Sequence, residues 1–284
     1  MTEVMYSLNS LFIAGALFGS LIVAIEVGYR IGQFNHGSAS DSSKTHVNAI
    51  QASLLGLVAL LLGFTFSLAL QRFDSRSKAV LDEANAIGTT YLRAQLLPTS
   101  VRSKVSKLLQ GYVDLRVRAG MIPLDDEAER QEELAKANEV LDDIWIYAQQ
   151  AAEEDKNPVT SGLFIQALNG AIDSYGRRDE ELNRHVPEVI LFLLFGTFLT
   201  ACAVIGYCAG FANHRPSVVT YVLIALIVIL TFIIVDLDRP RRGMIKVDQR
   251  NLMELKVAID VAQSVGKQSA VPAKLPRPAV TGRP

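Results

Sequence analysis

The side chains whose spacing could serve a function lie in an apolar segment of this sequence. Gly56, Leu60 and Phe64 are spaced by four residues, so in a helix they stack along one face. If several copies of that helix surround an axis, this stripe becomes stacked rings of apolar side chains, and such constrictions gate pores by dewetting. The alternative is that Leu60 and Phe64 simply pack within one subunit, and the residues by themselves favour it.

A second pattern in the same segment is a ridge of small residues at Ala59, Gly63 and Ser67. Small residues four apart let helix backbones approach closely in lipid, where hydrophobic association is weak. We therefore expect this ridge to pack against another helix.

Motifs of catalysis are missing from the sequence. It contains no P-loop, no G-x-S-x-G elbow, no H-E-x-x-H and no cysteine pair with metal-ligand spacing. Three histidines, His36, His46 and His214, fall on one side of the topology derived below, which leaves a pH-sensing or metal cluster open, although exposed loop histidines are the simpler interpretation. We expect no enzyme activity, no metal, no cofactor and no nucleic-acid partner.

Several ionisable residues flank the apolar segments. Glu26 lies near one end of the first segment, where its carboxylate either is hydrated among headgroups or faces a protein cavity. Glu26 is also a candidate for an ion pathway or for a structural salt bridge, and the other candidates are Arg72, Asp74, Asp236, Asp238 and Arg239. Pairing of Arg72 and Asp74 with the last helix is the interpretation we favour.

The segments themselves define the fold class. Half of the 284 residues are hydrophobic and only 20% are charged, and the apolar excess is concentrated in stretches of about 20 residues or more, the length that crosses a bilayer. These stretches are Val4–Ile25, Thr45–Gln71, Val189–His214 and Pro216–Val235. Buried helices of a soluble core would keep a polar stripe, and a cleaved signal peptide would begin with cations. The sequence therefore predicts an all-α integral membrane protein with spans at about 7–30, 50–71, 189–211 and 217–237.

The remaining residues form a second region. Residues 72–187, between the second and third spans, predict a helical domain that continues directly from the second span, because no proline occurs from Gln51 to Leu97. Asn157 and Pro158 have the types of an N-cap and a first helical residue. An amphipathic helix is expected within 238–265, and the proline-rich tail 266–284 is expected to be disordered.

Cations set the expected orientation. The two short connections hold three: Arg30, Lys44 and Arg215. The other side holds eleven close to the spans: Arg72, Arg76, Lys78, Arg177, Arg178, Arg184, Arg239, Arg241, Arg242, Lys246 and Arg250. This asymmetry predicts that both termini and residues 72–187 are cytoplasmic.

A resemblance adds to this interpretation. Residues 62–73 (LGFTFSLALQRF) resemble the pore-helix pattern of bestrophins, in which L-G-F is followed by Thr or Ser, Leu, and Arg with an aromatic residue. Residues 82–88 (DEANAIG), 91–93 (YLR) and 236–243 (DLDRPRRG) are similar to the bacterial membrane proteins called bestrophin-like. The resemblance covers roughly residues 5 to 260.

The resemblance implies a ring of five subunits in a bacterial inner membrane, with anions as the permeant ions. The neck aromatic would fall on Phe64, the preceding neck residue on Leu60 and the uppermost on Gly56, where a glycine departs from the bulky pattern. The acidic calcium cluster of animal bestrophins is not carried over, because Asp236 and Asp238 are followed at once by arginines.

The sequence thus supports an oligomeric ion channel whose second span lines the pore, with cation passage not excluded. The rival hypothesis is a non-conducting, membrane-anchored scaffold or signalling protein whose helical domain recruits partners. A transporter is disfavoured, because the two pairs of spans show no repeat.

Overall fold

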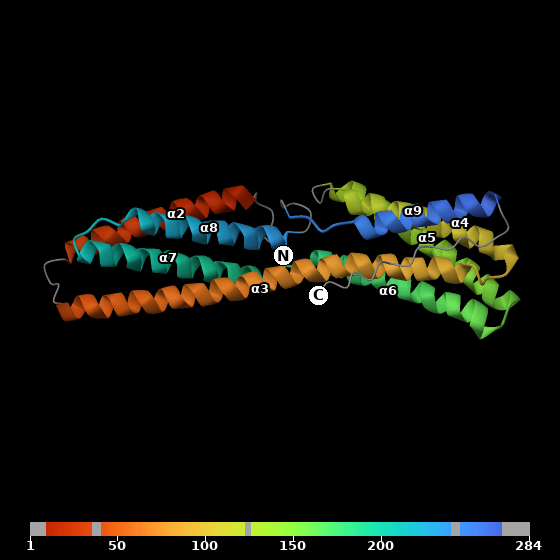
Figure 1. The fold of residues 1–284 in the computed structure, drawn as a ribbon, viewed down its shortest axis with the longest axis horizontal. Coiled ribbons are helices and arrows are strands. Elements are labelled where there is room, and N and C mark those ends of the chain that lie inside the picture. Colours follow the sequence, from red (N-terminus) through yellow and green to blue (C-terminus); the bar gives the residue numbers. More distant parts are fainter. Residues whose placement is uncertain (1–9, 36–40, 123–125, 240–244, 269–284) are drawn as a thin grey trace. The chain divides into compact units, whose positions relative to one another are not determined.

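The computed structural model describes residues 10–35, 41–122, 126–239 and 245–268. Within these ranges the chain is helical and contains no strand, so the predicted all-α fold is confirmed. The helices are α2 (Ser10–Phe34), α3 (Asp41–Ala94), α4 (Thr99–Met121), α5 (Glu127–Glu154), the π-helical turn η2 (Pro158–Gly162), α6 (Leu163–Asn183), α7 (Glu188–Phe211), α8 (Val218–Asp238) and α9 (Arg250–Gln268) (Figure 1). The start of the first predicted span and most of the predicted tail lie outside the described residues.

The helices form two compact units. The first comprises Met1–Phe73 and Arg184–Lys246, and the second comprises Asp74–Asn183 and Val247–Pro284. Helix α3 contributes to both units, and it contains no proline that would remove a backbone donor from its interior.

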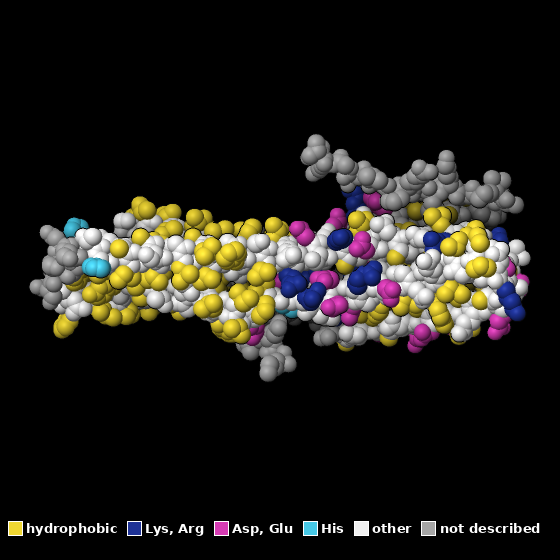
Figure 2. Space-filling view, turned by 90° about the horizontal axis from the view of Figure 1, so that it is seen from below, with side chains coloured by type: hydrophobic (Ala, Val, Ile, Leu, Met, Phe, Trp, Pro, Cys, Tyr) yellow, Lys and Arg dark blue, Asp and Glu magenta, His cyan; other side chains and the backbone are white. Residues whose placement is uncertain are grey.

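The first unit accounts for the membrane spans. Among the described residues, four helical stretches are long and apolar enough to cross a bilayer: Ser10–Phe34, Thr45–Ala94, Pro158–Phe211 and Val218–Asp238. On the face that Figure 2 shows, hydrophobic side chains predominate over this unit, whereas charged side chains gather over the second. An apolar exterior suits lipid rather than water, so the predicted membrane protein with four spans is confirmed.

Helices α2 and α7 make the tightest contact in the first unit. A Cβ added at Gly28 or Gly32 of α2 would overlap the backbone of Ala203 or Tyr207, and one added at Gly206 would overlap the backbone of Ile25. The residue numbers increase together along both helices, so α2 and α7 run parallel. Paired G-x-x-x-G spacings, completed by Gly210, therefore bring the two backbones together.

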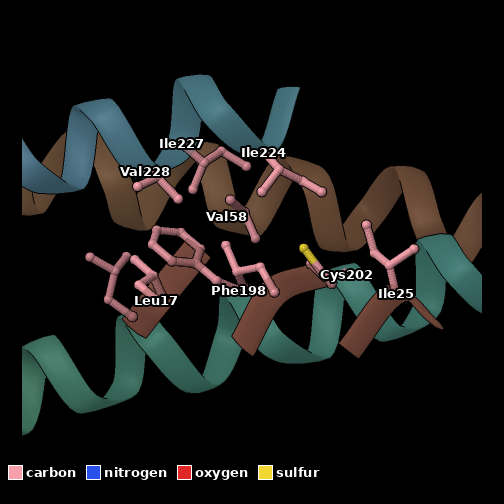
Figure 3. Close-up of a cluster of buried hydrophobic side chains, with 11 residues drawn as sticks. Leu17, Ile25, Val58, Phe198, Cys202, Ile224, Ile227 and Val228 are labelled. Carbon is pink, nitrogen blue, oxygen red and sulfur yellow. The ribbon is translucent and has the colours of Figure 1, made fainter. Parts of the chain in front are cut away.

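Apolar side chains from all four helices meet beside this contact. The buried cluster contains Leu17, Leu21, Ile25, Val58, Leu194, Phe198, Ala201, Cys202, Ile224, Ile227 and Val228 (Figure 3). Val58 brings α3 into the cluster, while Ala69 of α3 packs with Ile234 and Leu237 of α8. One face of α3 is therefore fixed against the bundle.

The second unit packs α4 against α5 and α9. Gln110 of α4 donates to Asp260 of α9 at 2.5 Å, and Lys256 forms an ion pair with Asp114. Asn157 caps the turn before α6, where its side chain accepts from Val159 N at 3.0 Å. That cap opens a π-helical turn rather than the regular α-helical start expected from the sequence.

The glycine contact predicts a difference between two substitutions in α7. Gly206→Ala should destabilise the protein by about 1–3 kcal/mol, because the added methyl group overlaps the backbone of α2. Gly196→Ala, which meets no atom within 4 Å, should be neutral or stabilising. Thermal unfolding in detergent compares the two, and equal midpoints would contradict the proposed close contact.

Candidate functional site

The membrane part of α3 has two distinct faces. Val58, Thr65 and Ala69 are buried against the other helices of the first unit. The Thr65 hydroxyl donates to the Leu61 carbonyl oxygen of the preceding turn at 2.6 Å, so this buried hydroxyl is satisfied within its own helix.

The opposite face carries the stripe singled out in the sequence. The side chains of Leu60 and Phe64 are 55% and 61% exposed, and a Cβ at Gly56 would meet no atom within 4 Å. In the described chain, Leu60 and Phe64 are therefore mostly exposed rather than buried in the core of the subunit. The stripe is available to another copy, to lipid or to a pore.

The small-residue ridge lies on the same open side. Ala59, Gly63 and Ser67 are exposed, and a Cβ at Gly63 would meet no atom within 4 Å. Within the chain, close helix packing uses the glycines of α2 and α7 instead. Sequence reasoning missed that pair, although the spacings Gly28–Gly32 and Gly206–Gly210 were visible.

The open face continues to the start of α3. A shallow hollow there is lined by His46, Ala49, Ile50, Ser53, Leu54 and Leu57. His46 and Ser53 are both exposed, so the stripe gains polar side chains toward this end.

Glu26 lies in an ion-pair cluster. Its carboxylate accepts from Arg30 Nε at 2.9 Å and from Arg215 Nη1 at 3.1 Å, and the Arg215 guanidinium lies 4.5 Å from the centre of the Tyr29 ring. These contacts tie α2 to the connection between α7 and α8. Two arginine partners make Glu26 a structural anchor at this end of the unit.

The acidic residues near the end of α8 are buried and bonded. Asp236 accepts from Ile245 N at 2.9 Å and Asp238 from Val186 N at 2.8 Å, while Arg239 Nη1 donates to Ser10 Oγ at 2.9 Å. These bonds hold the starts of α2 and α7 near the end of α8.

On α3, the two residues predicted to pair with the end of α8 differ in exposure: Arg72 is half-buried and Asp74 is exposed. The pairing of Arg72 or Asp74 with Asp238 or Arg239 stays a prediction. No group of three or more His, Cys, Asp or Glu residues in the described part of the chain is arranged to hold a metal ion.

A buried charged cluster in the second unit was missed by sequence reasoning. Glu83 of α3 is fully buried and pairs with Arg116 Nε of α4 at 2.6 Å and with Arg178 of α6. Arg178 also donates to Gln249 Oε1 at 2.6 Å, and the Arg116 guanidinium lies 4.4 Å from the centre of the Tyr175 ring.

The cluster is held together by charge. Burial by itself raises the pKa of the Glu83 carboxyl, but the charges of Arg116 and Arg178 outweigh it and hold that pKa below its ordinary value. A carboxylate shared by two arginines joins α3, α4 and α6, with Gln249 adding the segment before α9. Its signal in the sequence was weak, because the partners are 33 and 95 residues apart.

Comparison with known proteins identifies a family model that matches the sequence and solved structures that have a similar fold. The family model described as a bestrophin-like domain matches residues 18–252. Among curated proteins, none matches the sequence.

Solved structures of a bacterial bestrophin homologue from Klebsiella pneumoniae, each carrying one mutation, are similar to this chain. One has a TM-score of 0.60 at 15% identity and covers 86% of this chain and 97% of its own. Another has a TM-score of 0.57 at 17% identity, and the match covers 85% of this chain and 99% of the other chain. A further structure, described as a membrane protein, has a TM-score of 0.56 at 18% identity and covers 85% and 98%. At these identities the likeness shows a shared fold.

The charged cluster predicts the effect of removing Glu83. Glu83→Gln should lower the free energy of unfolding by about 3 kcal/mol or more, because two buried arginines lose their only bonded carboxylate among the described residues. Asp114→Asn, which breaks the half-exposed pair with Lys256, should cost less than about 1 kcal/mol.

The pH dependence has a defined sign. The pKa of Glu83 is lower in the folded chain than its ordinary value of 4.5, so its stabilisation is complete above that pH and is lost as the pH falls toward the folded pKa. Glu83→Gln should therefore show less acid destabilisation than the unsubstituted protein. Unfolding midpoints in detergent from neutral to acid pH measure this, and parallel curves would contradict it.

Proposed function

This chain belongs to the bestrophin-like family, and from that premise we propose that it is the subunit of an oligomeric ion channel whose α3 helices surround a central pore. Leu60 and Phe64 would form the apolar constriction, with Gly56 as a wider position beyond it. The observation that carries this proposal is the open face of α3, where Leu60 and Phe64 are 55% and 61% exposed and a Cβ at Gly56 would meet no atom within 4 Å among the described residues.

The composition of that face differs from that of the exposed face of α8. Exposed residues of α8 are bulky, including Val219, Val222 and Ile229. The open face of α3 instead presents small residues, such as Gly56 and Gly63, between the larger ones. Small residues favour close approach of another helix, so copies of α3 packed side by side around an axis account for this pattern.

The proposed permeant ions are anions. Aromatic rings present a positive edge, so a ring of Phe64 side chains turned edge-on to a pore favours negative charge. The acids that would have suited cations are engaged elsewhere, because Glu26 pairs with arginines and Asp236 and Asp238 accept backbone hydrogen bonds. Cation permeation is the alternative that a reversal-potential measurement would reveal.

The remaining parts of the proposal concern assembly and orientation. We take five as the subunit number from the family resemblance. We place the N-terminus, residues 72–187 and the C-terminal segment in the cytoplasm of a bacterial inner membrane, because the cations near the spans are concentrated on that side. The helices of the second unit would then form a cytoplasmic vestibule.

Anion flux from lipid vesicles tests the constriction. Phe64→Ala should raise flux roughly tenfold, if dewetting at the phenyl ring contributes about 1.4 kcal/mol to the barrier. Phe66→Ala is the matched control, because Phe66 lies on the same helix but about 200° around it from Phe64. Absence of flux from the unsubstituted protein and from Phe64→Ala would refute the channel proposal.

The mass of the protein in detergent separates the channel from a non-conducting scaffold. A pore needs a ring larger than a dimer, and five copies of the 31.0 kDa chain are expected. A dimer would favour the scaffold, with α3 buried in a two-helix contact. Gly63→Leu should shift the ring toward smaller species, because a large side chain blocks close helix approach.

A further inference from the structure

His46 and Phe64 lie on the same face of α3. The two residues are 18 positions apart, which is five turns at about 3.6 residues per turn, so their side chains leave the helix in the same direction. Three residues between them point within about 80° of the same direction: Ala49, Ser53 and Leu60. All of these residues are exposed.

A ring of α3 helices would place His46 at the same axis as Phe64. If Phe64 faces the axis of a ring, a continuous helix carries His46 to the same axis about 27 Å further along, at a rise of about 1.5 Å per residue. The hollow at the start of α3 includes His46 and Ser53, so these polar side chains line an open surface. Each additional copy of the chain adds one imidazole to the same level.

From this register we infer that His46 forms a ring of imidazoles at the outer entrance of the pore and sets the local concentration of permeant anions. The inference rests on the proposed channel. Histidine is the side chain whose ordinary pKa, about 6.5, brings its charge change into the range between pH 5 and 8. Protonation would add one positive charge per subunit at the entrance, and a ring of like charge attracts ions of the opposite sign.

Other ionisable groups at this end of the first unit have different placements. Arg30 on α2 and Arg215 after α7 each pair with Glu26 of α2. His214 lies in the connection between α7 and α8, with its Nδ1 2.6 Å from the carbonyl oxygen of Ala212. Among the described residues of α3, His46 is the one histidine.

The test measures anion efflux from vesicles as the pH on the His46 side is varied between 5 and 8 at low salt. Efflux from the unsubstituted protein should rise roughly tenfold toward acid pH, the lower end of the range for electrostatic steering. His46→Gln should remove this rise, and His46→Arg should give high efflux at every pH. The pH effect should shrink at about 1 M salt, where screening acts over about 3 Å.

His214→Gln is the matched control, since it removes the other described histidine at this end and should leave the pH response intact. If His46→Gln conducts and keeps the pH response, the inference is wrong while the channel stands. A pH response lost in His214→Gln but kept in His46→Gln would overturn the inference in the same way. If no variant conducts, both the channel and the inference fail.

Discussion

The close backbone contact between α2 and α7 is the constraint on which the membrane unit depends. Apolar side chains gain little by leaving lipid for one another, so helices in a bilayer associate where their surfaces fit closely. Gly28, Gly32, Gly206 and Gly210 supply that fit, because no side chain separates the two backbones. With α2 and α7 held together, α8 and one face of α3 pack against the pair.

That arrangement leaves α3 with an unused face. The face of α3 that packs against the bundle carries the buried residues Val58, Thr65 and Ala69. The other face carries Leu60, Phe64 and small residues, which are exposed. A glycine that contacts no neighbour gives the single chain no packing benefit and costs the helix stability relative to alanine. In the proposed ring, an approaching helix would give these small residues a packing role.

The fold was largely predictable from the sequence because its signals are local. Runs of about 20 apolar residues predict spans, and the absence of proline predicts a helix that continues out of the membrane to near Pro98, close to the observed end at Ala94. The LGFTFSLALQRF motif predicts the family that the comparisons found. The stripe of Gly56, Leu60 and Phe64 was also readable, since spacing by four residues fixes a common face of the helix.

What the sequence could not supply were pairings between distant segments. Nothing near Glu83 in the chain shows that Arg116 and Arg178 will share its carboxylate, because that choice depends on how α3, α4 and α6 pack. The same holds for Glu26, whose partners Arg30 and Arg215 come from one near and one distant position. Sequence reasoning left that carboxylate among headgroups, in a cavity or in a salt bridge, and in the structure it pairs with two arginines.

The two sets of small residues show why composition alone was an incomplete guide. The ridge of Ala59, Gly63 and Ser67 and the glycines of α2 and α7 have the same spacing, yet only the second set is in contact within one chain. Small residues four apart allow close packing of a helix against a neighbour. Which helix becomes that neighbour depends on how the whole bundle packs. Because α2 and α7 use their glycines on each other, the ridge on α3 stays exposed in the described chain. In the proposed ring it is the surface that another copy would meet, and the side chains from His46 to Phe64 would face the pore.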